Sequence, residues 1–263
     1  MENGQYVGSS TRLAIDELLV AADPPALARE AAARFARIAQ KAVARLGRVT
    51  LVLAGGSTPE RLYACLASEP YRTELPWHKT HIFWSDERAV PPEHPDSNFG
   101  MAKRALLDRV PVPADRIHRM QAERSDLDGA ASDYQAEIAM TFAVTPAGEP
   151  PAFDLILLGL GRDGHTASLF PSTQALRESR RWVCSNHIPM LKTNRLTLTP
   201  PILNRAMTIL LLVSGVDKAP ILQTVLRGPA APERLPIHLV RPASGRLIWL
   251  VDQDAAKGLG GRA

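Results

Sequence analysis

Residues 155–171, LILLGLGRDGHTASLFP, join an apolar strand pattern to a glycine-rich loop that carries a histidine and an aspartate. A strand that ends in Gly-x-Gly-x-x-Gly brings backbone N–H groups close to an anionic ligand. His165 follows the third glycine directly, and an imidazole exchanges protons near neutral pH. Asp163 stands two residues earlier and can orient the ring or stabilise its cation. The segment therefore predicts ligand binding and acid–base chemistry on one turn, with a helix beginning after it.

The composition of the 263-residue chain is that of an ordinary globular protein, with 45% hydrophobic and 22% charged residues. Its net charge of +4 is scattered, which argues against a nucleic-acid partner and suits an anionic small molecule. Cys65 and Cys184 stand far apart and form no Cys/His cluster, so we expect neither a disulfide nor a metal site. Apolar runs are too short to span a membrane and the first residues lack a secretion signal, so we expect a cytoplasmic protein.

Short apolar runs alternate with helical patterns along the chain. Apolar residues at three- and four-residue steps predict a helix over 24–46, with Asp23 as its N-cap and Gly47 as its C-cap. Strands are expected at 49–54, 81–84, 154–159, 208–213 and 247–251 and around Ile237, and further helices at 59–67, 98–107, 127–142 and 220–226. This alternation predicts an α/β fold with a mostly parallel sheet and helices on both faces.

We expect the whole of 1–263 to form a single domain, because the proline- and glycine-rich stretches lie inside the strand–helix alternation. Roughly ten residues at each end are expected to be flexible, and the small, glycine-rich tail from Ala255 onward is expected to fray.

A second glycine turn, AGGSTP at 54–59, directly follows an expected strand. Gly55 and Gly56 let the backbone approach a ligand, while Ser57 and Thr58 offer hydroxyl groups. The proline opens a helix, whose N-terminus favours anions. A tight strand-to-helix turn explains the same residues equally well, and the absence of a following lysine excludes a Walker motif.

Charged residues stand at two other strand ends or loops. The SDER segment at 85–88 follows an expected strand, and ligands of open α/β sheets lie at the carboxyl ends of strands. Asp86 and Arg88 are therefore candidates for contacts with hydroxyl groups, water or charge, although a solvated turn is the commoner explanation of such a motif alone. Arg195 and Lys218 suit a phosphate, yet each taken alone is an ordinary surface cation.

In this order, these elements resemble the 6-phosphogluconolactonase family. The resemblance rests on AGGSTP at 54–59, SDER at 85–88, DSNFG at 96–100, GLGRDGHTASLFP at 159–171, NRLTLT at 194–199 and the lysine of GVDKA, Lys218. These segments span most of the chain, and the loop with His165 is the most specific. The resemblance implies a Rossmann-like, doubly wound fold and hydrolysis of 6-phospho-D-glucono-1,5-lactone to 6-phosphogluconate in the oxidative pentose phosphate pathway, without a cofactor or metal.

The resemblance also implies roles for particular residues. His165 would be the general base that activates water, Asp163 would position it, Arg88 would stabilise the carbonyl oxygen and Asp86 would contact hydroxyl groups or water. The phosphate would be held by Gly55, Gly56, Ser57, Thr58, Arg195 and Lys218. The expected partner is a phosphorylated sugar lactone, with no nucleic acid and no membrane, and the chain is expected to be a monomer or a homodimer.

Two alternatives stay open. Glucosamine-6-phosphate deaminases share the glycine turn and the histidine loop, but they have a glutamate five residues after the histidine, where this chain has Phe170. A phenyl ring transfers no proton, and Arg88 stands where a deaminase-like chain has tyrosine, so the lactonase is favoured. The other alternative is a non-catalytic sugar-phosphate sensor, which usually carries a DNA-binding segment; the N-terminal region has no helix-turn-helix pattern.

Overall fold

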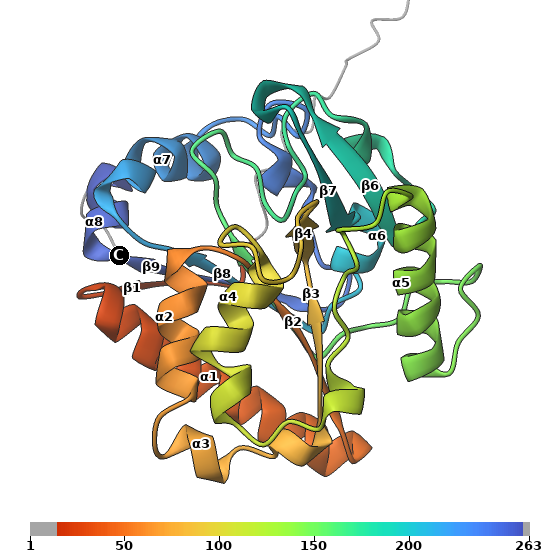
Figure 1. The fold of residues 1–263 in the computed structure, drawn as a ribbon. Helices are drawn as coiled ribbons and strands as arrows, with labels where there is room; N and C mark the ends of the chain where they lie inside the picture. Colours follow the sequence, from red (N-terminus) through yellow and green to blue (C-terminus); the bar gives the residue numbers. More distant parts are fainter. Residues whose placement is uncertain (1–14, 260–263) are drawn as a thin grey trace, which may run out of the picture.

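In the computed structural model, which describes residues 15–259, a six-stranded parallel sheet forms the centre of the molecule (Figure 1). The strand order is β1-β9-β8-β5-β2-β3, and every neighbouring pair is parallel. The strands are β1 (Glu17–Ala21), β2 (Val49–Leu53), β3 (Thr80–Trp84), β5 (Leu155–Gly159), β8 (Thr208–Val213) and β9 (Arg246–Asp252). The predicted α/β fold with a mostly parallel sheet is confirmed.

Helices flank this sheet on both sides. They are α1 (Pro24–Leu46), α2 (Ser57–Leu66), α3 (Tyr71–Glu74), α4 (Asn98–Ala105), α5 (Leu127–Phe142), α6 (Pro200–Leu203), α7 (Ala219–Arg227) and α8 (Gln253–Ala256). The chain crosses the sheet in one direction from β1 through β2 to β3 and in the other from β5 through β8 to β9. Since such crossovers are almost always right-handed, α1 and α2 are expected on one face and the connections after β5 on the other. Figure 1 shows α1 and α2 below the sheet and α7 and α8 above it.

Helix α1 begins and ends where the sequence predicts. The Asp23 side chain accepts a hydrogen bond from the Ala26 N–H at 2.7 Å, which satisfies one of the first free donors of the helix. Gly47 ends the helix in the left-handed conformation, with φ of 71°. The buried face of α1 packs on β1, β2 and β9.

A second, three-stranded sheet lies beside the main one and was not predicted. Its order is β4-β7-β6, with antiparallel pairing between β4 (Asp86–Arg88), β7 (Thr193–Leu198) and β6 (Val183–Ile188). Strand β4 starts directly after β3, with only Ser85 between them, so the chain passes from one sheet into the other almost without a loop. Helix α5 packs against β6 and β7. Three of the four residues of the SDER segment thus form a strand, and not the solvated turn that such a motif alone more often indicates.

Short 3-10 helices complete the described chain. They are η1 (Trp77–Lys79), η2 (Leu107–Arg109), η3 (Ala114–Arg116), η4 (Gln174–Arg177), η5 (Pro189–Leu191), η6 (Val216–Lys218), η7 (Pro236–Leu239) and η8 (Lys257–Leu259). Ile237 lies in η7 and not in a strand; its N–H donates to the Gly164 carbonyl at 3.0 Å. The strand expected there is therefore wrong, because this apolar residue supports a loop instead of a sheet.

Two further expectations about local structure are wrong. No helix begins after His165, because Ala167 has a φ of 48°, which lies outside the right-handed helical region. The segment from Ala255 to Leu259 is helical instead of frayed, since the Asp252 carboxylate accepts from the Ala255 N–H at 2.8 Å and Ala255 is fully buried. The remaining end residues of that prediction, 1–14 and 260–263, lie outside the described residues.

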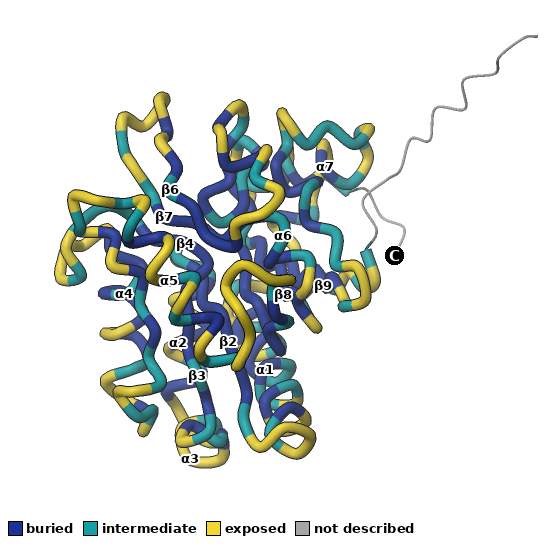
Figure 2. The backbone as a smooth tube through the Cα atoms, turned by 90° about the vertical axis from the view of Figure 1, so that its right-hand side faces the viewer, coloured by how far each residue is buried: buried dark blue, intermediate teal, exposed yellow. Residues whose placement is uncertain are grey.

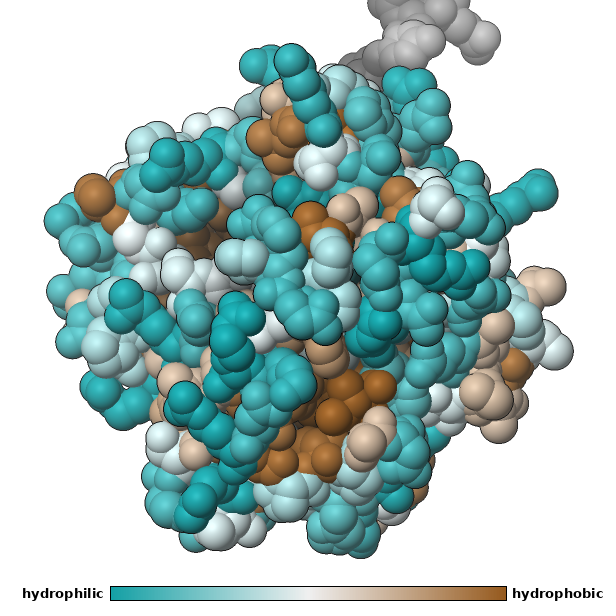
Figure 3. Space-filling model, viewed as in Figure 1, coloured by the Kyte–Doolittle hydropathy of each residue, from teal (hydrophilic) through white to brown (hydrophobic). Residues whose placement is uncertain are grey.

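Hydrophobic side chains form the core of the described chain. Figure 2 shows buried backbone through the strands and exposed backbone at the loops. All four tryptophans, Trp77, Trp84, Trp182 and Trp249, are fully buried in the core. The face drawn in Figure 3 is mostly hydrophilic, with apolar side chains gathered below its centre. Within residues 15–259, none of the helices combines the length and hydrophobicity needed to cross a bilayer.

The strand order creates a crevice at the carboxyl ends of two inner strands of the main sheet, β2 and β5. From β2 the chain moves outward to β3, whereas from β5 it moves the opposite way to β8, although β2 and β5 are neighbours. Connections at such a switch point leave toward opposite faces, and ligands of open α/β sheets bind in the crevice between them. The glycine turn after β2 and the histidine loop after β5 both start at this point.

A histidine pair, the half-buried His81 and the buried His118, lies away from that crevice, near the start of β3. His81 Nδ1 lies 3.0 Å from His118 Nε2, and His118 Nδ1 lies 2.7 Å from Glu137 Oε1 on α5. The His118 ring stacks on Phe83, with centroids 4.2 Å apart. Burial, together with the neighbouring His118, lowers the pKa of His81 to about 4.

This histidine predicts an acid-sensitive fold. In the unfolded chain His81 titrates near a pKa of about 6.5, so between pH 6.5 and pH 4 the unfolded state takes up a proton that the folded state does not. The His81 contribution to stability is therefore lost as the pH falls through this window. Thermal unfolding of His81→Asn and wild type between pH 7.5 and 4 should show a shallower loss of melting temperature in the variant. Parallel curves would contradict the prediction.

Candidate functional site

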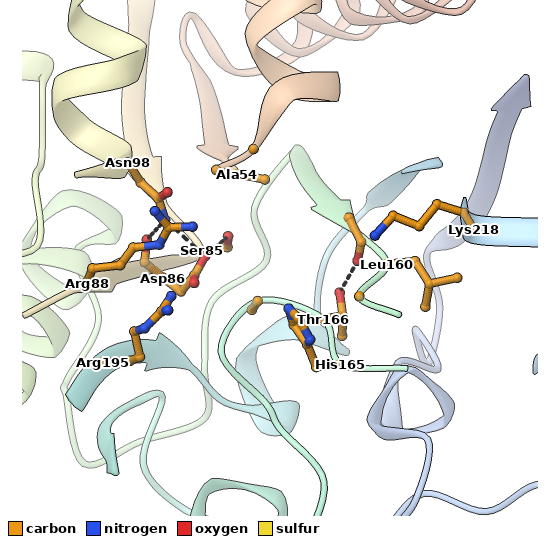
Figure 4. Close-up of a pocket in the computed structure, with 15 residues that line it drawn as sticks. Ala54, Ser85, Asp86, Arg88, Asn98, Leu160, His165, Thr166, Arg195 and Lys218 are labelled. Carbon is orange, nitrogen blue, oxygen red and sulfur yellow. Dashed lines mark hydrogen bonds between the residues drawn. The ribbon is translucent and has the colours of Figure 1, made fainter. Parts of the chain in front are cut away.

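A cleft of about 200 Å³ opens at the crevice between the carboxyl ends of β2 and β5 (Figure 4). The predicted site residues that line it are Gly55, Gly56, Asp86, Arg88, His165, Arg195 and Lys218. Ser57 and Thr58 line an adjoining hollow of about 150 Å³, which shares Gly55, Gly56 and Lys218 with the cleft. Asp163 does not line the cleft, but it is hydrogen-bonded to His165. Segments from across the sequence thus meet at one place.

The imidazole of His165 is held by Asp163. Nδ1 lies 2.5 Å from Asp163 Oδ1, and the same oxygen accepts from the His165 backbone N–H at 3.1 Å. Burial opposes ionisation of this carboxyl group, but the hydrogen bonds from His165 outweigh it and lower the pKa of Asp163. An ionised carboxylate at Nδ1 favours the tautomer with the proton on that nitrogen, which leaves Nε2 as an acceptor.

The loop that carries His165 is shaped by its own backbone. The Gly161 N–H donates to the His165 carbonyl at 2.8 Å, and the Gly164 N–H donates to the Gly161 carbonyl at 3.0 Å. Gly164 has a φ of 79°, a conformation that favours glycine. The Thr166 hydroxyl donates to the Gly159 carbonyl at 2.9 Å and so ties the loop to the end of β5.

Asp86 is buried and fixed in place on β4. Its carboxylate accepts from the Ser168 hydroxyl at 2.6 Å and from the Ser85 hydroxyl at 3.1 Å. The Asn98 side chain donates to the Asp86 carbonyl at 2.8 Å. This carboxylate therefore faces the cleft from a rigid support, with the loop after His165 bonded directly to it.

Two arginines stand together on the same side of the cleft. Arg88 and Arg195 are register partners across the β4–β7 ladder. Among the described residues, the buried Nε atoms of both guanidinium groups have no hydrogen-bond partner. Burial lowers the pKa of Arg195, against the attraction of Asp86. Buried Nε donors without a partner on two half-buried cations are costly, so this side of the cleft suits an anion or a polarised oxygen.

Lys218 approaches the cleft from the opposite side. Figure 4 shows Arg88, Arg195 and Asp86 on one side of His165 and Lys218 on the other. The Lys218 ammonium is 3.9 Å from Asp217, but Arg162 donates to that carboxylate at 2.9 Å. A ligand that fills the cleft would therefore meet positive charge from both sides.

The turn after β2 adds backbone donors to the Lys218 side. Gly56 is the N-cap of α2, with a φ of 101° and no side chain capping the first turn. The free N–H groups there and the helix dipole favour an anion. The buried Tyr63 hydroxyl accepts from the Ala54 N–H at 2.9 Å and donates to its carbonyl at 2.7 Å, which fixes the turn.

Asn98 and Glu87 also contribute to the site, although neither is among the residues predicted for it. Asn98 lines the cleft, and a Cβ on Gly55 would lie only 1.8 Å from its Oδ1, so the two chain segments touch. Glu87 is buried and accepts from the Asn98 N–H at 2.7 Å. The DSNFG segment is part of the family resemblance, but its sequence does not reveal that Asn98 contacts Glu87 and Gly55, because these residues are more than ten positions away. Residues 15–259 contain no group of three or more His, Cys, Asp and Glu side chains that could hold a metal ion.

Known proteins resemble this chain in sequence over most of its length. Residues 22–249 match the model of a family described as glucosamine-6-phosphate isomerases/6-phosphogluconolactonase. The chain belongs to this family. Within it, a 6-phosphogluconolactonase of Synechocystis sp. is 46% identical and covers 83% of this chain and 88% of its own length. One from Streptomyces coelicolor is 36% identical and covers 92% of this chain and 94% of its own length.

Solved structures of the family have the same fold. A 6-phosphogluconolactonase from Trypanosoma cruzi superposes with a TM-score of 0.81 at 28% identity, covering 95% of this chain and 99% of its own. A monomeric glucosamine-6-phosphate deaminase superposes with a TM-score of 0.75 at 22% identity, covering 92% of this chain and 99% of its own, which shows a shared fold alone.

The geometry of the histidine loop predicts a strong effect of one small substitution. A Cβ on Gly161 would lie 2.0 Å from His165 Nδ1 and 2.7 Å from Asp163 Oδ1, so Gly161→Ala must displace the imidazole. Gly159 lines the same cleft, and a Cβ there meets nothing within 4 Å. Displacement of a reacting group by an ångström lowers turnover by about 100-fold. We expect that loss in Gly161→Ala and not in the matched Gly159→Ala.

Crystal structures of the two glycine variants supply the direct check. The Gly161→Ala structure should show the His165–Asp163 hydrogen bond broken, and the Gly159→Ala structure should keep it. An undisturbed imidazole in Gly161→Ala would contradict the prediction.

Proposed function

We propose that this protein hydrolyses 6-phospho-D-glucono-1,5-lactone to 6-phosphogluconate, the step of the oxidative pentose phosphate pathway for which its relatives are named. One observation carries the proposal: an imidazole backed by a carboxylate lies in a cleft that has cationic side chains on both sides. A lactone is an activated ester, so a water molecule, a base and a site for the developing negative charge are enough for its hydrolysis.

In the proposed mechanism His165 is the general base. Its Nε2 takes a proton from a water molecule as the water oxygen attacks C1 of the lactone. Asp163 accepts the hydrogen bond from Nδ1 and stabilises the imidazolium that forms. The tetrahedral intermediate then collapses with cleavage of the bond from C1 to the ring oxygen, and the imidazolium returns its proton to that oxygen. The products are a carboxylic acid and a free hydroxyl group.

The remaining polar residues bind different parts of the substrate. Arg88 stabilises the negative charge on the carbonyl oxygen, and Asp86 accepts hydrogen bonds from substrate hydroxyl groups or water. The phosphate lies between Arg195 and Lys218. Its oxygens accept hydrogen bonds from the N–H groups of Gly55 and Gly56 and from the hydroxyl groups of Ser57 and Thr58. The support for this division is that the cations line the cleft from opposite sides and that no side chain caps the start of α2.

The two other functions have less support. A deaminase needs a carboxylic acid where this chain has Phe170, whose ring lies against His165. A sensor binds a sugar phosphate without needing an oriented base, so the short Asp163–His165 hydrogen bond has no purpose in it. A cytoplasmic location, and a monomer or homodimer as the functional form, stay predictions.

The first test is the hydrolysis of freshly prepared lactone, coupled to 6-phosphogluconate dehydrogenase. Wild type should exceed the spontaneous rate, and His165→Ala should lose about 10²–10⁴-fold in kcat because general-base assistance is absent. His78→Ala, at an exposed histidine on η1, is the control for loss of a histidine outside the cleft. A wild-type rate no faster than the spontaneous one would exclude the lactonase, and glucosamine-6-phosphate would be the next substrate to try.

Loss of a phosphate contact should affect binding more than turnover. Lys218→Ala removes a charge-assisted hydrogen bond worth about 1.5–3 kcal/mol, so KM should rise by about 10–100-fold with a smaller change in kcat. Lys192→Ala, at a lysine outside the cleft, should leave both constants unchanged. An unchanged KM in Lys218→Ala would remove this lysine from the phosphate site.

A further inference from the structure

The imidazole of His165 lies flat against the ring of Phe170. The two centroids are 4.0 Å apart with an interplanar angle of 20°, and Phe170 is 4% exposed. The guanidinium carbon of Arg195 lies 6.0 Å from the centroid of the same ring. One buried aromatic side chain therefore contacts the proposed base and stands near a proposed phosphate ligand.

We propose that Phe170 is a positioning residue, whose ring fixes the plane of the His165 imidazole so that Nε2 stays directed at the attacking water. The proposal rests on the proposed function, in which His165 is the base. It assigns to Phe170 an effect on turnover that a side chain filling space in the core would not have.

Asp163 alone cannot set the plane of the imidazole. Its hydrogen bond to Nδ1 fixes one atom of the ring at 2.5 Å, but the last side-chain torsion of histidine is broad and has no sharp minimum of its own. A flat aromatic surface at van der Waals distance restricts that torsion. The carboxylate and the phenyl ring together therefore define both the direction and the plane of the base.

Phe170 can act in this way because its own segment is held rigidly. The Phe170 carbonyl accepts from the Thr173 hydroxyl at 2.7 Å. Asn186, buried on β6, donates to that hydroxyl at 3.0 Å and to the Ser168 carbonyl at 2.9 Å. The small sheet thus sets the position of the phenyl ring, and the ring in turn sets the plane of the His165 imidazole.

The contact also suits the cation that forms during the proposed reaction. When His165 takes the proton from water, an imidazolium lies over the negative face of the phenyl ring, which is the arrangement of a cation–π interaction. This attraction develops as the proton is transferred. Interactions that strengthen toward the transition state raise kcat without tightening substrate binding.

The experiment compares kcat and KM for Phe170→Leu, Phe170→Met and a control, Phe153→Leu. Phe153 is a fully buried ring that lies against Phe83 and Phe142, and it does not line the cleft. We expect a fall in kcat of about 10–100-fold in both Phe170 variants, with KM nearly unchanged. The control should lose melting temperature and keep kcat. Two replacements at Phe170 keep the test possible if one variant does not fold.

A spectroscopic measurement on the substrate-free protein checks the stacking itself. The imidazole C–H resonances of His165, assigned by their loss in His165→Ala, should be shifted upfield by the phenyl ring current. They should move downfield in Phe170→Leu and stay in place in Phe153→Leu. Unshifted resonances in wild type, or Phe170 variants that keep the wild-type kcat, would overturn the proposal.

The outcomes separate this inference from the proposed function. If wild type does not accelerate lactone hydrolysis, the proposed function fails, and the resonances still test the stacking. If wild type is active, His165→Ala is inactive and the Phe170 variants keep kcat, the base is supported and only the positioning role is lost.

Discussion

One buried carboxylate holds the β4 side of the cleft together. Glu87, on β4, accepts from the Ser97 hydroxyl at 3.0 Å, from the N–H groups of Asn98 and Phe99 at 2.7 Å each, and from the Arg88 N–H at 2.8 Å. It is 3% exposed, and burial raises its pKa against the effect of these hydrogen bonds. By binding the first turn of α4 to β4, this group places Asp86 and Arg88 beside Asn98. The hydrogen bond from the Asn98 side chain to the Asp86 carbonyl is a second link between the two elements.

The two sides of the cleft are joined by the loop after His165. The Ser168 hydroxyl donates to Asp86, while the Ser168 N–H donates to the Thr197 hydroxyl at 3.2 Å. At its other end the loop is supported by the hydrogen bond from Ile237 to Gly164. His165, Asp86 and the arginine pair therefore share one hydrogen-bonded framework. This framework explains why the loop that follows β5 of the main sheet is aligned with residues of the small sheet.

The sequence predicts the parts of this fold whose pattern is local. Strands β2, β5 and β8 are almost entirely apolar, with Thr50 and Thr208 as their polar residues, because helices and loops cover both faces of the sheet. Asp163 and His165 meet because they are two residues apart on a glycine loop. Strand β1 was not predicted, and it is held at the sheet edge by its pairing with β9, which is more than 200 residues away in the sequence. Strand β4 is only three residues long and entirely charged, so it is a strand through pairing with β7 and not through propensity. The roles of Glu87, Asn98 and Phe170 depend on such distant contacts and have no local pattern.

The pairing of β1 with β9 has a consequence for how the protein is made. Within residues 15–259, the first strand of the main sheet has only the last strand as a neighbour. During synthesis β1 therefore stays unpaired while α1 and the strands β2, β3 and β5 are made and can pack together. Long-range pairing of this kind slows folding and leaves an open strand edge for a time. Since every residue that lines the cleft precedes β9, the ribosome releases the whole site before it releases the strand that closes the sheet.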